Sequence, residues 1–96
     1  MSERTQHETT EYMVFEEWPN DKWPSGHAAA GPFDSYSAAL NYLVSYEKDL
    51  RTERKFNVVT GEDDLVWETT PIVNGWFEYK RRGSDHDPIS VRIERT

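Results

Sequence analysis

One segment of the chain, residues 35 to 54, has the periodicity of an amphipathic helix. It constrains the fold most, because every other apolar segment has the short pattern of a strand. Asp34 or Ser35 offers the side-chain oxygen that caps a helix N-terminus. Glu47 can pair with Arg51 one turn later. We expect the buried face of the helix to consist of Ala39, Leu40, Leu43, Val44 and Leu50.

Five strands are predicted around this helix. The first precedes it, at Tyr12 to Phe15, where four apolar residues follow one another. The others follow it, are rich in β-branched and aromatic residues, and cover residues 56–59, 65–72, 76–81 and 89–94. The order β-α-β-β-β-β predicts an α+β fold, in which an antiparallel β-sheet of four to five strands packs against one amphipathic helix.

Turn signals separate these strands. Asn74-Gly75 lies between two apolar pairs and predicts a tight hairpin, since both residues tolerate a positive φ. Gly61 ends the predicted strand at residues 56–59. Pro71 confines its end of the predicted strand at residues 65–72 to a sheet edge or a bulge. A solvated turn is predicted at Glu62, Asp63 and Asp64.

Two segments at the N-terminal end have no strand or helix pattern. Residues 1–10 contain no apolar side chain after Met1, so we expect a flexible tail followed by a single α+β domain over residues 11–96. Residues 18–33 contain three prolines and two glycines, which predict a loop without a regular element. The pairs Trp18-Pro19 and Trp23-Pro24 favour an ordered loop that packs on itself.

Composition excludes several classes of function. The chain of 96 residues has 18 acidic and 11 basic side chains, a net charge of −7, which argues against a general nucleic-acid or anionic-membrane binder. It has no cysteine, which removes disulfides, thiolate zinc sites and cysteine nucleophiles. With no apolar run of membrane-spanning length and no signal-peptide pattern, we expect a cytoplasmic protein that needs no cofactor.

The patterns of common catalytic sites are weak here. Ser25 and Ser84 lie beside glycines, but neither belongs to a G-x-S-x-G turn. Pro32 and Phe33 stand where a phosphate-binding loop needs Lys and Ser or Thr. Asp85, His86 and Asp87 have the ligand types of a divalent metal site and leave open a small metal-dependent enzyme. The same residues before a proline are also typical of an ordinary turn, and we expect no enzyme.

Negative charge and aromatic side chains concentrate at the N-terminal end. Residues 1–21 contain six acidic side chains and one base, Arg4, so five of the seven excess negative charges lie there. Acidic and aromatic surface can bind a basic partner, although net charge also serves solubility alone. The predicted partner-binding residues are Glu16, Glu17, Trp18, Asp21, Trp23, Glu62, Asp63 and Asp64.

The leading hypothesis is therefore a non-catalytic, acidic protein-binding module whose partner has a basic surface. Its size and charge suit a small inhibitor, encoded by a phage or mobile element, of a nucleic-acid-handling host defence complex of the anti-CRISPR or anti-restriction type. The alternative is a nucleic-acid-binding accessory protein that uses Lys80, Arg81, Arg82 and the adjacent aromatic Trp76. The alternation of side chains along a strand weakens that alternative. If Phe77 and Tyr79 face the core, Glu78 lies on the outer face beside Lys80 and offsets its positive charge.

Overall fold

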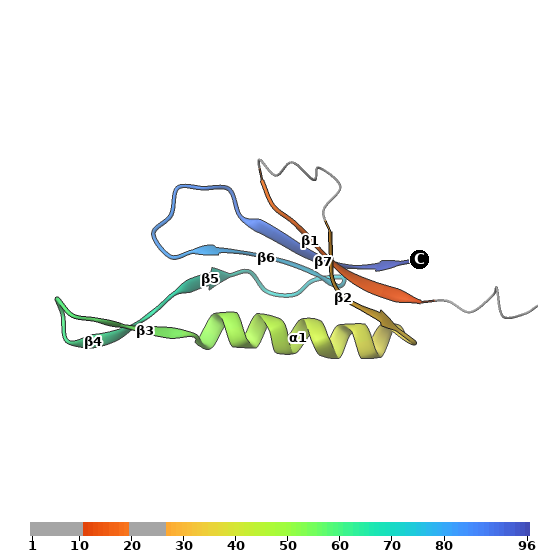
Figure 1. The fold of residues 1–96 in the computed structure, drawn as a ribbon, viewed down its shortest axis with the longest axis horizontal. Coiled ribbons are helices and arrows are strands. Elements are labelled where there is room, and N and C mark those ends of the chain that lie inside the picture. The colour runs from red at the N-terminus through yellow and green to blue at the C-terminus, as the bar shows by residue number, and fades with distance from the viewer. Residues whose placement is uncertain (1–10, 20–26) are drawn as a thin grey trace, which may run out of the picture.

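A five-stranded antiparallel sheet carries one helix across a single face, and a separate two-stranded sheet lies at one end (Figure 1). The computed structural model describes residues 11–19 and 27–96. Its elements are β1 (Tyr12–Glu17), β2 (His27–Phe33), α1 (Tyr36–Thr52), β3 (Arg54–Asn57), β4 (Glu62–Leu65), β5 (Trp67–Thr69), β6 (Trp76–Arg81) and β7 (Ile89–Arg95). The large sheet has the order β2-β1-β7-β6-β5, and the small one pairs β3 with β4. The predicted α+β class, with one helix on an antiparallel sheet, is confirmed.

Helix α1 begins and ends close to the predicted positions. Ser35 is the N-cap, and its Oγ accepts a hydrogen bond of 3.1 Å from the backbone N–H of Ala38. The predicted pair is present, with Arg51 Nε 2.9 Å from Glu47 Oε2. Val44 was expected in the buried face but is exposed, because only a narrow stripe of the helix meets the sheet. In the described part of the chain, no helix is long and apolar enough to cross a membrane.

The core lies between α1 and the sheet. Among the described residues, five apolar side chains are completely buried there: Val14, Ala39, Leu43, Phe77 and Val91. The predicted alternation along β6 is confirmed, because Phe77 and Tyr79 are buried whereas Trp76 on the opposite face is 41% exposed. Leu50 and several partly buried aromatic rings extend this cluster along the helix.

The carboxylate of Glu16 is buried at the edge of the core. Glu16 of β1 is only 6% exposed, and its Oε2 accepts hydrogen bonds from the hydroxyl of Tyr46 on α1 and, at 3.0 Å, from that of Tyr79 on β6. Trp18 Nε1 donates to the other oxygen at 2.9 Å. A buried carboxylate is costly unless it is hydrogen-bonded. Glu16 thus binds the helix to two strands of the sheet through one side chain.

The prediction of no regular element in residues 18–33 is wrong for residues 27–33, which form β2. Among the described strands it pairs with β1 alone, which makes it the outer strand of the sheet. An edge strand needs hydrogen bonds on only one side, so it accommodates Gly31 and Pro32. A Cβ on Gly31 would lie 2.8 Å from Met13 Sδ, which explains why glycine occupies this irregular point of the pairing.

The turn predicted at Glu62, Asp63 and Asp64 is also wrong, because these residues begin strand β4. The chain reverses earlier, over residues 58–61. Asn57 causes this shift: its Oδ1 accepts hydrogen bonds from the backbone N–H groups of Val59 at 2.9 Å and Thr60 at 3.3 Å. An asparagine that bonds the backbone ahead of it favours a turn over a continued strand, which overrides the strand preference of Val58 and Val59.

The Asn74-Gly75 hairpin is present as predicted. Both residues have positive φ, 54° and 71°, and the flanking Val73 and Trp76 exchange backbone hydrogen bonds of 2.9 and 3.1 Å. The strand before this turn is shorter than predicted, since β5 ends at Thr69. Pro71 provides no N–H to continue it, and the Thr70 hydroxyl instead accepts from the N–H of Glu78 at 2.8 Å.

Alkaline pH is expected to unfold the protein through Tyr46 and Tyr79. Burial raises the pKa of Tyr79 to about 12, and burial together with the bond to Glu16 raises the pKa of Tyr46 further. Unfolded tyrosines lose their protons near pH 10, before the folded ones do, so the free energy of unfolding falls as pH rises from about 10 to about 12. Urea titrations at several pH values measure this slope.

The Tyr79→Phe variant should lose about 1.5–3 kcal/mol at neutral pH, since a hydrogen bond to a charged group is removed. It should also show a flatter fall of stability above pH 10. The exposed Tyr42→Phe is the matched control and should keep the native slope. If the free energy of unfolding fell equally steeply above pH 10 in the native chain and in both variants, the role assigned to the buried hydroxyls would be contradicted.

Gly75→Ala is expected to destabilise the protein more than Gly61→Ala. Both glycines have positive φ, which costs other residues about 1–2 kcal/mol. A Cβ on Gly75 would also lie 2.6 Å from the Tyr36 hydroxyl, whereas a Cβ on Gly61 meets nothing within 4 Å. Thermal unfolding of the two variants compares them directly, and equal losses would show that Tyr36 moves aside without cost.

Candidate binding site

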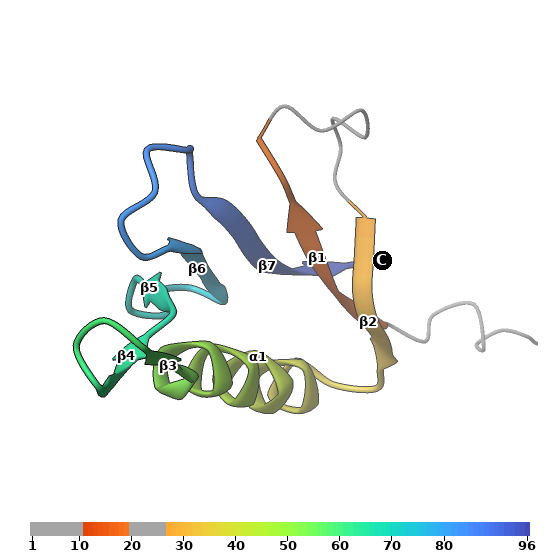
Figure 2. The ribbon, with the colours of Figure 1, turned by 60° about the vertical axis from the view of Figure 1, so that its left-hand side comes forward.

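Strands β3 and β4 form a hairpin, residues 54–65, that extends beyond the C-terminal end of α1 (Figures 1 and 2). Among the described strands, each of the two pairs only with the other. Two backbone hydrogen bonds connect the hairpin's base to the rest of the fold. The N–H of Val66 donates to the carbonyl of Glu53 at 3.1 Å, and the N–H of Arg82 donates to the carbonyl of Val66 at 2.8 Å. The hairpin therefore has a held base and a free tip.

Apolar side chains are exposed at the tip of the hairpin. Val58 is 83% exposed and Val59 is 89% exposed, and Phe56 on the adjoining strand is 58% exposed. The turn that presents them is held by the Asn57 side chain and by the N–H of Gly61, which donates to the Asn57 carbonyl at 2.8 Å. Single exposed apolar residues are ordinary, but several adjoining ones indicate an interaction surface.

The second strand of the hairpin is acidic. Glu62, Asp63 and Asp64 are exposed in succession on β4. Asp64 lies opposite Lys55 in the pairing and accepts a hydrogen bond of 2.8 Å from Asn57 Nδ2. The hairpin thus combines an apolar tip with an acidic strand.

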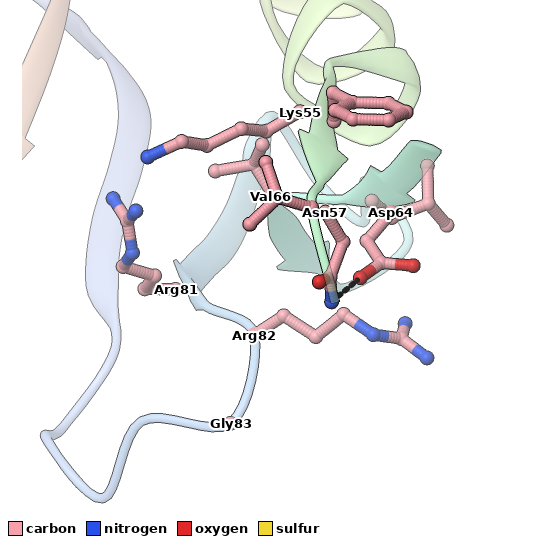
Figure 3. Close-up of a pocket in the computed structure, with 10 residues that line it drawn as sticks. Lys55, Asn57, Asp64, Val66, Arg81, Arg82 and Gly83 are labelled. Carbon is pink, nitrogen blue, oxygen red and sulfur yellow. Dashed lines mark hydrogen bonds between the residues drawn. The ribbon is translucent and has the colours of Figure 1, made fainter. Parts of the chain in front are cut away.

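A groove of about 610 Å³ lies between the hairpin and the C-terminal end of β6 (Figure 3). Three cationic side chains line it: Lys55 from β3, Arg81 at the end of β6, and Arg82 directly after it. The one acidic side chain among the lining residues is Asp64, already bonded to Asn57. The rest of the lining is Phe56, Asn57, Val58, Leu65, Val66 and Gly83.

Aromatic contacts support one side of this groove. The guanidinium carbon of Arg81 lies 5.9 Å from the centre of the Trp67 ring, a cation–π distance. Trp67 packs edge-on against Tyr79, with ring centres 5.3 Å apart, and its Nε1 donates to Glu53 Oε1 at 2.9 Å. Arg81 is therefore oriented by a side chain that is itself held by the helix end and the core.

The predicted partner-binding residues do not lie together. Glu16 was expected on an exposed carboxylate surface, but it is buried and bonded, and so it is removed from that surface. Glu17 forms an ion pair with Arg92 at 2.9 Å, and Trp18 next to it is 47% exposed. Both lie at the end of β1. Both views show this end far from the hairpin, which carries Glu62, Asp63 and Asp64 (Figures 1 and 2). Asp21, Trp23 and the tail of residues 1–10 lie outside the described residues.

The predicted nucleic-acid-binding residues are divided as well. Arg81 and Arg82 line the groove, but Lys80 donates to the Ser84 carbonyl at 3.4 Å and lines a separate pocket of about 240 Å³. Trp76 begins β6, at the opposite end of that strand from Arg81. The sequence interpretation missed Lys55, whose place in the groove depends on the hairpin pairing.

Asp85, His86 and Asp87 occupy an exposed loop between β6 and β7. Ser84 Oγ accepts a hydrogen bond of 3.0 Å from the N–H of His86, which is typical of a side-chain-stabilised turn. Over residues 11–19 and 27–96, no three acidic or histidine side chains converge in a way that could hold a metal ion.

The hairpin and the groove at its base are thus two parts of the described surface that gather residues suited to binding. The hairpin offers apolar and acidic groups, and the groove offers cationic ones. Comparisons with protein-family models, curated proteins and solved structures found no match.

Proposed function

We propose that this chain is a non-catalytic protein-binding module that places the tip of its hairpin into an apolar pocket rimmed by basic side chains. The observation that carries the proposal is the exposure of Val58 and Val59, at 83% and 89%, on a turn whose backbone is hydrogen-bonded to the Asn57 side chain. Neither side chain is part of the buried core.

Burial of the tip supplies a favourable free energy of association. Complete burial of one valine side chain contributes about 1.5–3 kcal/mol, and the tip offers two such side chains beside Phe56. Because Asn57 already holds the turn, less conformational entropy is lost on binding than for a flexible loop. A stable interface covers about 800 Å² on each partner, so we expect the flanks of the hairpin to take part as well.

The acidic strand indicates the charge of the partner. Glu62 and Asp63 are exposed next to the apolar tip, where they would attract basic side chains at the rim of the pocket. Complementary charge of this kind raises the rate of association and excludes wrong partners. The net charge of −7 acts in the same direction over a longer distance.

The class of partner that we propose is a nucleic-acid-handling complex, because the working surface of such a complex is basic. In that form the chain acts as a small inhibitor, of phage or mobile-element origin, directed against a host defence complex of the anti-CRISPR or anti-restriction type. Its small size and acidic charge support this proposal.

Replacing both tip valines by serine should weaken capture of the partner while leaving the fold intact, since both side chains are exposed. The native chain, immobilised, should retain a basic protein from a lysate, and the Val58→Ser/Val59→Ser protein should retain at least about tenfold less of it. Tenfold corresponds to a loss of about 1.4 kcal/mol in binding free energy. Val44→Ser on the helix, 48% exposed, is the matched control and should behave as the native chain. Equal retention by all three proteins would overturn the proposal.

The acidic strand should act mainly on the rate of association. Glu62→Gln with Asp63→Asn is expected to slow association severalfold at low salt and to make the rate less sensitive to salt. Glu68→Gln, an exposed acidic residue on β5, is the control and should change little. Surface-binding kinetics with the captured partner measure both effects, and an unchanged salt dependence would contradict the predicted basic rim.

A further inference from the structure

We infer that the groove at the base of the hairpin is a binding site for a nucleotide phosphate, with the attached base lying on the groove's apolar wall. This goes beyond the proposed protein-binding function, because it concerns a different ligand and a groove that shares only Phe56 and Val58 with the apolar tip. The starting observation is that Lys55, Arg81 and Arg82 all line one groove of about 610 Å³ (Figure 3).

The charges in the groove favour an anionic ligand. Among the described residues, none of the three cations forms an ion pair with an acidic side chain. Asp64 is the only acidic residue in the lining, and Asn57 Nδ2 already donates to it at 2.8 Å. Three cations against one carboxylate leave the lining with a net positive charge, and a bound anion reduces the repulsion among the cations.

The two arginines favour phosphate as that anion. A guanidinium group presents paired N–H donors that match the oxygens of a phosphate. Arg81 is oriented by the Trp67 ring at 5.9 Å, and the backbone of Arg82 is held by its bond to the Val66 carbonyl at 2.8 Å. In Figure 3 the ends of the Lys55 and Arg81 side chains reach one side of the groove, and Arg82 extends along the other.

The size and apolar lining of the groove favour more than a bare ion. Sites for small organic ligands measure about 300–1,000 Å³, and this groove lies within that range. Four apolar side chains line it beside the cations: Phe56, Val58, Leu65 and Val66. Bases bind such surfaces through stacking and apolar contact, with little dependence on their identity. A phosphate that carries a nucleoside uses both parts of the lining.

The same phosphate chemistry has two sources, a free nucleotide and a single nucleic-acid strand. The test is a nuclear magnetic resonance titration of the full ¹⁵N-labelled chain at low salt. The probes are adenosine monophosphate, adenosine, inorganic phosphate and a short oligothymidylate. We expect adenosine monophosphate to shift the amide signals of residues 55, 81 and 82, and to lose affinity as salt is added. Adenosine alone should bind at least about tenfold more weakly, because it lacks the charge that the cations recognise.

Arg81→Ala with Arg82→Ala should weaken nucleotide binding at least about tenfold, and Lys55→Gln alone should weaken it severalfold. The matched control is Lys48→Ala with Arg95→Ala, which removes the same charge from residues that do not line the groove. It should bind as the native chain does. If the arginine pair fails to fold, judged by its amide spectrum, the Lys55→Gln variant decides the question.

Each outcome bears on the inference. Tighter binding of the oligothymidylate than of the mononucleotide supports a strand as the source, and equal or weaker binding supports a free nucleotide. The inference would be overturned if inorganic phosphate bound as tightly as the nucleotide, or if no probe shifted any amide signal. It would also be overturned if the control variant lost as much affinity as the variant without the two arginines. No partner protein is present in this experiment, so its failure leaves the protein-binding proposal untouched.

Discussion

The hydrogen-bonded carboxylate of Glu16 is the interaction on which the arrangement of this small protein depends. The helix covers one face of the sheet, and among the described residues only five apolar side chains between them are completely buried. A core of that size permits a helix to rotate or slide at small cost. Glu16 limits both motions, because Tyr46 from the helix and Tyr79 from β6 must reach the same oxygen atom. A displaced helix would leave a buried charge without its partners, which costs more than a lost apolar contact.

The position of the helix in turn sets the position of the candidate binding surfaces. The helix ends at Thr52, and the Glu53 carbonyl accepts the N–H of Val66, whose own carbonyl accepts the N–H of Arg82. This short series of backbone bonds places the hairpin beside the end of β6 and so creates the groove (Figure 3). An apolar tip, an acidic strand and a cationic groove therefore share one end of the molecule. A partner protein held at the tip would lie close to a nucleotide held in the groove.

Much of the fold could be predicted from the sequence, and the errors have physical causes. The helix, the Asn74-Gly75 turn and the alternation along β6 were predictable, since each depends on residues within a few positions of one another. Strand β2 was missed because glycine and proline disfavour strands in general, although an edge strand tolerates them. The hairpin turn was misplaced because the Asn57 side chain outweighs the strand preference of two valines. The site was predicted less well, because Glu16 is buried and Lys55 enters the groove only through strand pairing.

The sequence by itself determined the fold class, the helix with its cap at Asp34 or Ser35, and the concentration of cations in Lys80, Arg81 and Arg82. These features follow from the spacing of residues along the chain. Only the tertiary structure decided that Glu16 meets Tyr46 and Tyr79, which lie 30 and 63 positions away. It also decided that Arg81 and Arg82 share a groove with Lys55 and not with Trp76. The reason is that the order in which strands pair is set by burial of the whole core, so charged residues are brought together by contacts in which they take no part.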